Sequence, residues 1–353
     1  MLLSQLAMTL LSFSSLGGST HSTIPSNDSH VRYVGRFDLQ NADGPRCAWP
    51  ASMVEFSFKG STAKVKLRES GLDQYQVVID GSPTSILKPE KGDGTYELAT
   101  NLPSKVHRVQ IVKRTESYVG MGQFLGFDLD GPMMNLPKSH RLIEVIGDSI
   151  SCGYGNEGKV KEEHFKPETE NAYLTYGALT ARELNADFHD IAWSGRKMWP
   201  DNTIPEIYDL ALPEDKTSTW NLKDSIPDVI VINLATNDFG NKNPDQKGWT
   251  EAYSAFIQRL RGRAPKARIY CTVGPMMTDN WPPNNKALTT VKSYLVEVLR
   301  LRASVGDDNI RVIEFETQDE ARDGIGSDWH PNLKTHRKMA DVLEAAIRSD
   351  LKW

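Results

Sequence analysis

The chain has 353 residues, with 41 Lys plus Arg against 46 Asp plus Glu and a formal net charge of −5. Without a basic excess, this composition disfavours nucleic acid and anionic membranes as partners. At roughly 150 residues per domain the length indicates two domains, with one large domain still allowed. Three scattered cysteines, Cys47, Cys152 and Cys271, predict neither a disulfide scaffold nor a structural zinc site.

The N-terminal segment is apolar and uncharged. Residues 1–18 read MLLSQLAMTLLSFSSLGG, and no Asp, Glu, Lys or Arg precedes Asp28. An apolar run followed by small residues predicts a secretory signal peptide over residues 1–20 and therefore a secreted protein. No Lys or Arg precedes the run, so a disordered or cloning-derived leader is the alternative. The run is too short and too rich in serine for a membrane span.

Residues 31–132 show a β-rich pattern. Short runs of alternating apolar and polar residues recur at 53–58, 63–67, 74–79 and 106–112, and turn residues such as Asp80-Gly81-Ser82 separate them. Regular short strands without helical patterns predict an antiparallel β-sandwich or jelly roll. The glycine- and proline-containing stretch 130–137 is the expected linker.

From residue 138 to 353 strands and helices alternate. Apolar strand-like runs are found at 142–146, 187–192, 229–234, 268–273 and 310–315. Amphipathic segments of helical length are found at 172–184, 250–261, 287–302 and 334–348. This alternation predicts an α/β domain in which helices cover both faces of a parallel sheet.

Residues that could take part in catalysis follow the predicted strands. Ser149 lies in Gly147-Asp148-Ser149 after the first, Gly195 follows the second, and Asn237 follows the third. Because functional residues gather at the carboxyl ends of parallel strands, these residues are expected to meet. A serine among glycines can be a nucleophile, with backbone N–H groups and an Asn amide as oxyanion donors.

A histidine block completes the set near the C-terminus. His330 in Gly326-Ser327-Asp328-Trp329-His330 can act as general base on a serine, and Asp328 can orient its imidazole. Each piece also has a structural explanation, such as a turn at Asn237 or a helix cap at Asp328. Their joint occurrence at strand ends favours a catalytic site.

The chain resembles a known family. The resemblance rests on the strings GDSISCGYG, WSGR, ATND and SDWHPN after a β-rich N-terminal part. They are similar to those of carbohydrate esterase family 2 in the SGNH (GDSL-type) hydrolase superfamily. Members are acetyl esterases that remove O-acetyl groups from plant polysaccharides such as xylan and glucomannan. The resemblance implies a three-layer α/β/α sheet domain preceded by a jelly-roll-like domain.

The resemblance also implies residue roles. Ser149 would be the nucleophile and His330 the general base, while the backbone N–H groups of Ser149 and Gly195 and the Asn237 amide would form the oxyanion hole. The sequence departs from the superfamily twice. Ala235 stands where Gly is usual, and Ser327 stands three residues before the histidine, where the acid is usual. Asp328, two residues before, is expected to complete a triad, and a Ser–His dyad oriented by a backbone carbonyl is the alternative.

Aromatic residues beside these motifs are candidates for sugar stacking. Trp329 next to His330 is the first candidate for substrate binding, and Trp199, Tyr154 and the weaker Trp193 follow, with core packing as the alternative for each. No cofactor or metal is expected, because the predicted acyl transfer requires none and neither His164 nor His189 lies in a metal-ligand spacing.

Two other functions remain open. A lipase or thioesterase would keep Ser149 and His330 but act on longer acyl chains, and a non-catalytic carbohydrate-binding protein would need neither. The expected partner is an acetylated polysaccharide or oligosaccharide, with no nucleic acid and no membrane, and the chain is expected to be a monomer.

Overall fold

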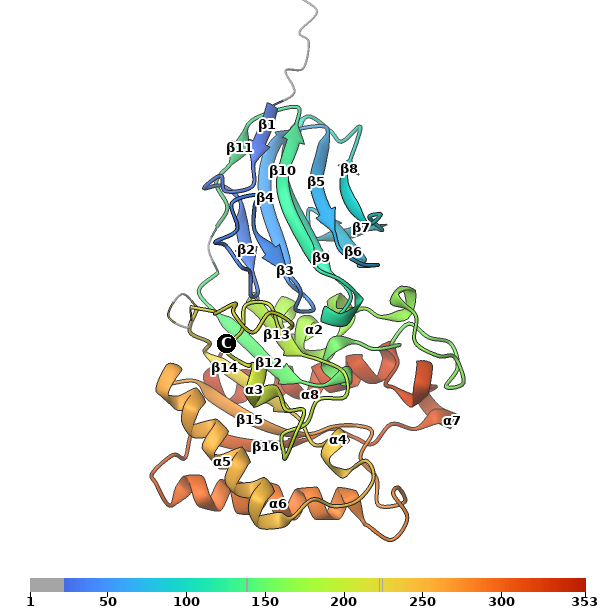
Figure 1. Ribbon diagram of the computed structural model, residues 1–353, viewed down its shortest axis with the longest axis vertical. Coiled ribbons are helices and arrows are strands. Elements are labelled where there is room, and N and C mark those ends of the chain that lie inside the picture. The colour runs from blue at the N-terminus through green and yellow to red at the C-terminus, as the bar shows by residue number, and fades with distance from the viewer. Residues whose placement is uncertain (1–21, 138, 222, 224) are drawn as a thin grey trace, which may run out of the picture.

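The computed structural model describes residues 22–137, 139–221, 223 and 225–353. Two antiparallel sheets form the upper part of the molecule in Figure 1, and an α/β unit forms the lower part. This architecture confirms the predicted fold class. The predicted signal peptide, residues 1–20, lies outside the described residues. Within the described ranges, no helix combines the length and apolarity that a membrane span needs.

The upper part is a β-sandwich. Its first sheet has the order β1 (Ser22–Pro25), β10 (Gly122–Leu129), β5 (Ala63–Glu69) and β8 (Gly92–Ala99), with β3 (Arg46–Cys47) also on β10. The second has the order β11 (Met133–Met134), β4 (Met53–Gly60), β9 (Lys105–Lys113), β6 (Tyr75–Ile79) and β7 (Ser82–Leu87), with β2 (Arg32–Val34) also on β4. Alternation sets the inner face, since Val65 and Leu67 on β5 are buried while Lys64 and Lys66 are not.

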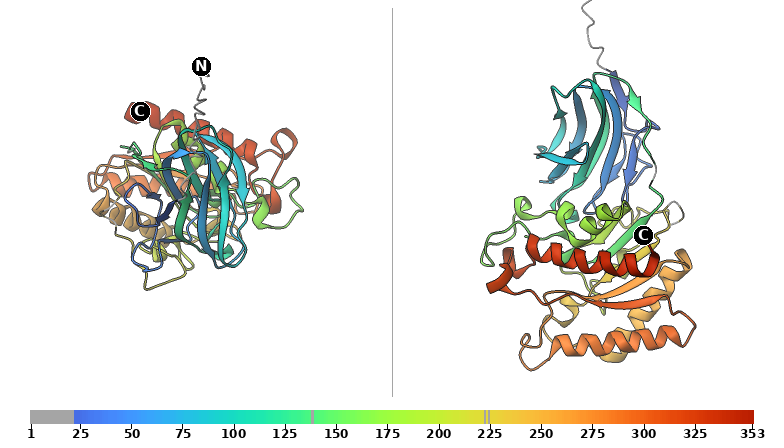
Figure 2. Two further views of the ribbon diagram at one scale, coloured as in Figure 1. Left: turned by 90° about the horizontal axis from the view of Figure 1, so that it is seen from above. Right: turned by 180° about the vertical axis from the view of Figure 1, so that it is seen from behind.

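The lower part contains one parallel sheet with the order β13 (Asp187–Ala192), β12 (Leu142–Gly147), β14 (Val229–Asn233), β15 (Arg268–Val273) and β16 (Ile310–Glu314). Helices α2 (Tyr176–Glu183) and α8 (Leu333–Leu351) pack together on one face, and α5 (Gln246–Arg263) and α6 (Ala287–Ala303) on the other. Figure 2 shows α8 crossing its face of the sheet. Because helices cover both faces of the sheet, the side chains on both sides of β12 and β14 are buried, which explains why these strands are apolar.

Short helices occupy the connections. They are α1 (Ser149–Cys152), α3 (Ile204–Ile207), α4 (Thr236–Phe239), α7 (Glu320–Asp323) and the 3-10 helices η1 (Ser117–Val119), η2 (Pro167–Thr169), η3 (Ala172–Leu174) and η4 (Ser327–Trp329). The expected helix over 172–184 is interrupted at Thr175, which has an extended backbone with φ −72° and ψ 159°. Its hydroxyl donates to the Ala172 carbonyl at 2.9 Å, which stabilises the end of η3.

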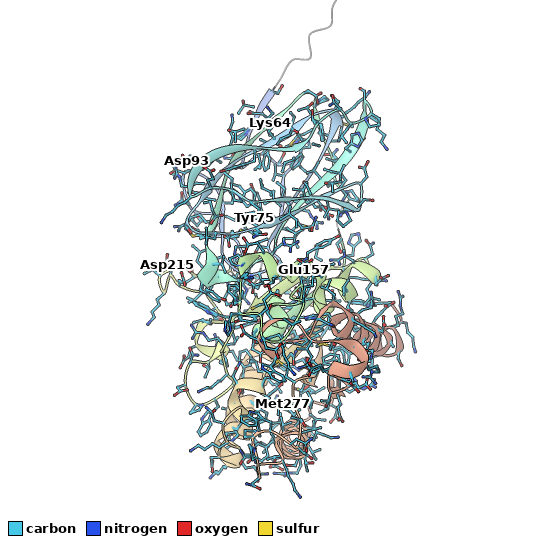
Figure 3. All side chains as sticks on the ribbon, turned by 90° about the vertical axis from the view of Figure 1, so that its right-hand side faces the viewer. Lys64, Tyr75, Asp93, Glu157, Asp215 and Met277 are labelled. Carbon is cyan, nitrogen blue, oxygen red and sulfur yellow. The ribbon has the colours of Figure 1, made fainter. Side chains whose placement is uncertain are left out.

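Buried contacts join the two parts. Trp49 of the sandwich is only 1% exposed, lies in the core around α5 and donates from its indole N–H to the Leu210 carbonyl at 3.2 Å. Arg114, at the end of β9, is also buried and pairs with Glu157, which lies where the two parts meet in Figure 3. The sandwich is therefore packed into the α/β unit.

A cavity of about 310 Å³ lies between the second sheet of the sandwich and the α2–β13 region. Arg32, Arg108, Tyr173 and Asp187 contribute to its walls. No residue predicted for catalysis lines it, so the candidate site lies elsewhere, at the carboxyl ends of the parallel strands. There β12 lies between β13 and β14, the point at which α/β sheets commonly bind ligands.

Candidate active site

Ser149 lies where the chain turns tightly from β12 into α1. Asp148 is the N-cap of α1, and its carboxylate accepts the Ile150 N–H at 3.0 Å. Gly147 is required here, because a Cβ at this position would lie 2.1 Å from the Ser151 hydroxyl oxygen. Ser149 is the first residue of α1, so its own N–H has no intrahelical acceptor and is available to a ligand.

His330 is positioned as the base for this serine. Its Nε2 lies 2.8 Å from Ser149 Oγ, and its Nδ1 lies 2.9 Å from the backbone carbonyl oxygen of Asp328. Because that carbonyl can only accept, Nδ1 carries the proton and Nε2 is free to accept one from the serine. Burial lowers the pKa of His330 to about 4, so the imidazole is neutral at neutral pH.

The Asp328 carboxylate is not directed at His330, which departs from the expected triad. It accepts three hydrogen bonds, from the Tyr154 hydroxyl at 2.8 Å, His164 Nδ1 at 2.9 Å and the Phe165 N–H at 2.9 Å. Burial opposes ionisation, but the bonds from His164 and Tyr154 outweigh it and lower the pKa of Asp328. The geometry is that of a Ser–His dyad oriented by a backbone carbonyl.

The backbone around Asp328 explains this arrangement. Asp328 has φ 48° and ψ 43°, and Trp329 has φ 66°, so two consecutive non-glycine residues occupy the left-handed region. Ser327, at the usual position of the acid, is fully buried against two glycines. A Cβ at Gly155 would lie 2.6 Å from Ser327 Cβ, and one at Gly158 would lie 2.1 Å from Ser327 Oγ. This packing leaves no space for a carboxylate at 327.

The predicted oxyanion donors come from two neighbouring loops. Gly195 follows β13, is exposed and has φ 77°, a conformation that favours glycine. Asn237 lies in α4 and donates from Nδ2 to the Arg196 carbonyl at 2.9 Å, which ties the two loops together. Nδ2 also makes a long contact of 3.5 Å with Asp148 Oδ2, a hydrogen bond weak enough for an oxyanion to replace. Ala235, in place of the usual glycine, has φ 149°, so the glycine conformation is kept despite the methyl group.

Asp238, directly after Asn237, anchors the loop after Gly195. Its carboxylate accepts the backbone N–H groups of Met198 at 3.1 Å and Trp199 at 2.9 Å, and the Trp249 indole N–H at 2.9 Å. Burial raises its pKa to about 6. A strand-end acid followed by an amphipathic helix was the available signal, but its partners are distant in the sequence.

The predicted aromatic residues have different surroundings. Trp329 is 54% exposed beside His330, with Lys161 Nζ 4.3 Å from its ring centroid. Tyr154 lies with its ring centroid 4.3 Å from that of His330. Trp199 is half-buried against α5 and the core, so much of its ring surface is occupied. Trp193 is half-buried as well, with the Arg196 guanidinium 4.5 Å from its ring centroid.

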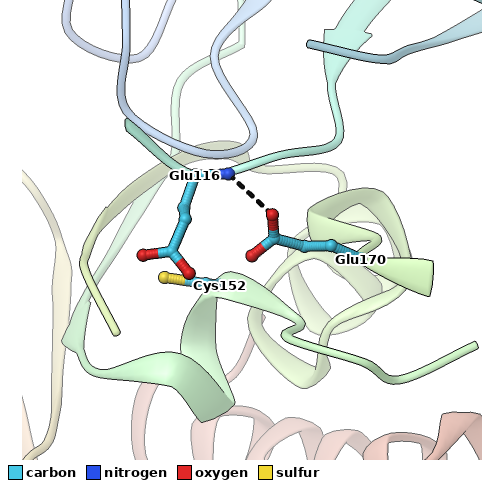
Figure 4. A group of neighbouring side chains, drawn as sticks. All are labelled: Glu116, Cys152 and Glu170. Atoms are coloured by element: carbon cyan, nitrogen blue, oxygen red, sulfur yellow. Dashed lines mark hydrogen bonds between the residues drawn. The ribbon is translucent and has the colours of Figure 1, made fainter. Parts of the chain in front are cut away.

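A cluster of potential metal ligands lies near Ser149. Among the residues that the structure describes, Glu116, Cys152 and Glu170 bring ligand atoms within 4.8 Å of one another, and all three are buried (Figure 4). Glu116 and Glu170 are not predictable from the sequence, because no motif joins them. His164 contacts Asp328 at the surface, and His189 is buried with Nδ1 3.8 Å from a Glu144 oxygen.

Comparisons with known proteins agree with this architecture. Residues 33–137 match the family model of the carbohydrate esterase 2 N-terminal domain, and residues 145–338 match that of the GDSL-like lipase/acylhydrolase family. The chain is 39% identical over 341 residues to the cellulase/esterase CelE of Acetivibrio thermocellus, covering 94% of this chain but only 41% of CelE. It is 30% identical over 319 residues to an acetylxylan esterase/glucomannan deacetylase of Cellvibrio japonicus, covering 84% of this chain and 83% of that protein.

A solved structure is similar over almost its whole length. It is a family two carbohydrate esterase from Clostridium thermocellum in complex with cellohexaose, with a TM-score of 0.86 and 39% sequence identity. The match covers 92% of this chain and 99% of that one.

Proposed function

Because the chain belongs to carbohydrate esterase family 2 of the GDSL-like hydrolases, we propose that it removes O-acetyl groups from plant cell-wall polysaccharides. The substrates would be acetylated xylan, glucomannan or their oligosaccharides. The 2.8 Å contact between Ser149 Oγ and His330 Nε2 carries the proposal, because it joins a nucleophile to a neutral base. The name of the Cellvibrio relative supports the substrate class.

In the proposed first step, His330 Nε2 takes the proton of the Ser149 hydroxyl as Oγ attacks the acetyl carbon. The carbonyl oxygen becomes an oxyanion, which accepts hydrogen bonds from the Ser149 and Gly195 N–H groups and the Asn237 amide. The Asp328 carbonyl holds the imidazole in the required tautomer throughout. The tetrahedral intermediate then collapses, and the sugar oxygen leaves with the proton from Nε2.

The second step repeats the chemistry with water. His330 takes a proton from water, the hydroxide oxygen attacks the acetyl carbon of the ester on Ser149, and the same three donors hold the oxyanion. Collapse of this intermediate returns the proton to Ser149 Oγ and releases acetate. Every step is a proton transfer or an acyl transfer, so the scheme requires no metal or cofactor.

The surroundings of the dyad favour a carbohydrate substrate over a long acyl chain. Trp329 is largely exposed beside the base, and an exposed indole face can stack on the apolar face of a pyranose ring. We propose Trp329 as a sugar contact, with Tyr154 and Trp199 as further contacts. We also propose that the protein acts as a monomer, which light scattering tests.

The test is acetate release from acetylated xylan and acetylated glucomannan by wild-type protein and by Ser149→Ala. We expect wild-type activity on at least one polymer and none above background in the variant. Deacetylation that persists in Ser149→Ala would contradict the mechanism. Faster hydrolysis of long-chain than of acetyl aryl esters would favour a lipase or thioesterase, and polysaccharide binding without acetate release would favour a carbohydrate-binding protein.

We also propose that the protein is secreted. The support is the uncharged apolar run over residues 1–18, together with a substrate that lies outside cells. Expression of the full chain followed by N-terminal sequencing of protein from the medium tests this. Full-length protein retained inside the cells would contradict it.

A further inference from the structure

We infer that Glu116 is a positioning residue for the oxyanion hole. Glu116 belongs to the β-sandwich part of the chain and acts on Gly195 through Ser194. The inference rests on the proposed esterase function. Glu116 lies three residues after the end of β9 and directly before η1, on a segment that reaches the loop after β13. It is fully buried, although it belongs to a different part of the chain from Ser149, His330 and Asn237.

Glu116 holds the residue that precedes the oxyanion glycine. Its carboxylate accepts the Ser194 backbone N–H at 2.7 Å and also accepts from the Ser194 hydroxyl. Gly195 is exposed, and no atom outside its chain neighbours lies within 4 Å of the position that a Cβ would take. Because packing does not hold this turn on that side, hydrogen bonds must fix the direction of the Gly195 N–H. Asn202 provides another, from Nδ2 to the Gly195 carbonyl at 3.1 Å.

Glu170 limits the negative charge that this arrangement brings to the site. The Glu116 N–H donates to Glu170 Oε2 at 3.0 Å (Figure 4), while Glu170 Oε1 has no hydrogen-bond partner among the described residues. Burial and the nearby Glu116 carboxylate raise the pKa of Glu170 well above its usual range, which favours the protonated form of Glu170. The pair then carries at most one negative charge, which weakens its repulsion of the developing oxyanion.

We assign this cluster to positioning rather than to a cation site. Both Glu116 carboxylate oxygens already accept hydrogen bonds from Ser194. Burial raises the pKa of the Cys152 thiol well above its usual value, with the nearby Glu116 and Glu170 adding to the effect. A protonated thiol and a protonated carboxyl are poor metal ligands.

The same segment also reaches the general base. Tyr118 lies two residues after Glu116, in η1, and its ring centroid is 5.5 Å from that of Phe165. The ring centroid of Phe165 is 4.7 Å from that of Tyr154, and the Tyr154 centroid is 4.3 Å from that of His330. One short stretch of the sandwich therefore contacts the loop of the oxyanion donor and begins a row of rings that ends at the catalytic imidazole.

Steady-state kinetics of Glu116→Ala and Glu116→Gln on 4-nitrophenyl acetate and acetylated xylan test the inference. A displacement of about 1 Å in catalytic geometry can cost on the order of 100-fold in rate. We therefore expect Glu116→Ala to lower kcat by about 10- to 100-fold. KM should change by less than about threefold, because the oxyanion forms only in the transition state. Glu116→Gln should recover most of the lost kcat, because its amide oxygen can still accept from Ser194.

Two further variants provide controls. Glu55→Gln changes another fully buried acid of the sandwich, one that pairs with Arg32, which in turn reaches Asp187 of the α/β unit. It should leave kcat unchanged even if the thermal midpoint falls. Ser194→Ala should lower kcat about 3- to 10-fold, and adding it to Glu116→Ala should cost little more than Glu116→Ala alone, since both remove one contact.

The outcomes separate this inference from the proposed function. If wild-type protein is active and folded Glu116→Ala keeps kcat within threefold, the positioning role is wrong while the esterase function stands. Equal losses in Glu116→Ala and Glu55→Gln would also overturn it. If Glu116→Ala does not fold, Ser194→Ala decides, and a kcat within twofold of wild type overturns the inference. Wild-type protein without esterase activity would instead contradict the proposed function.

Discussion

Substitution of Asp328 distinguishes a catalytic dyad from a triad. In a Ser–His–Asp triad, replacing the acid by Asn lowers kcat by about 10⁴-fold, because the histidine is left in the wrong tautomer. Here the backbone carbonyl of Asp328, which no side-chain substitution removes, accepts from His330 Nδ1 at 2.9 Å. Asn also tolerates the left-handed conformation that residue 328 adopts. We therefore expect Asp328→Asn to lose no more than about 10-fold in kcat.

Asp328→Ala should have the larger effect. It removes the acceptor of three hydrogen bonds, from Tyr154, His164 and Phe165, each with a net contribution of about 1 kcal/mol. It also places a residue that disfavours positive φ at the turn. Local stability should fall by about 3 kcal/mol. The carbonyl then loses its fixed direction, so kcat should fall further than in Asp328→Asn.

The assay is hydrolysis of 4-nitrophenyl acetate, with thermal unfolding measured on the same samples. His164→Ala is the matched control, because it removes only one of the three bonds and its side chain is 91% exposed. It should retain nearly full kcat. A loss of 10³-fold or more in folded Asp328→Asn would show that the carboxylate itself supports His330, and the dyad would be refuted.

Three further predictions concern the same region. Asn237→Ala should lower kcat by about 10²- to 10³-fold with KM and the circular dichroism spectrum little changed, and near-normal turnover would exclude Asn237 from the oxyanion hole. Burial lowers the pKa of His330 to about 4, so kcat/KM should stay level from pH 8 to 6 and fall only at lower pH, as the imidazole gains a proton and can no longer act as base. An acid limb centred at pH 6.5 or above would contradict this reasoning. Cys47, Cys152 and Cys271 are all fully buried free thiols, so a thiol reagent should label none in the native protein and all three in denaturant; rapid native labelling would contradict it.

The sequence predicts the fold class and the central residues because both depend on local patterns. Strand ends follow from apolar runs of a few residues, and Ser149, Gly195 and Asn237 each lie three residues after the end of such a run. Once the strands are parallel, their carboxyl ends share one edge, and the site follows from topology. Helix interruption at Thr175 was not predictable from periodicity, because one side-chain bond to the Ala172 carbonyl decides it.

The direction of the Asp328 carboxylate could not be predicted in the same way. It depends on two consecutive residues with positive φ, and on partners more than 160 positions away, at Tyr154, His164 and Phe165. Glu116 was missed for a related reason. Its contact with Ser194 joins two parts of the chain whose patterns are independent, and no spacing reveals it.

The burial of Trp49 has a consequence for how this architecture can be altered. A tryptophan from the sandwich fills part of the hydrolase core, and the buried Arg36 donates to the Tyr208 carbonyl and pairs with the buried Glu144. Detaching the sandwich would open a cavity the size of an indole and leave a buried carboxylate with fewer partners. The two halves should therefore melt in one cooperative transition. We therefore expect that replacing the sandwich with another module would destabilise the hydrolase part.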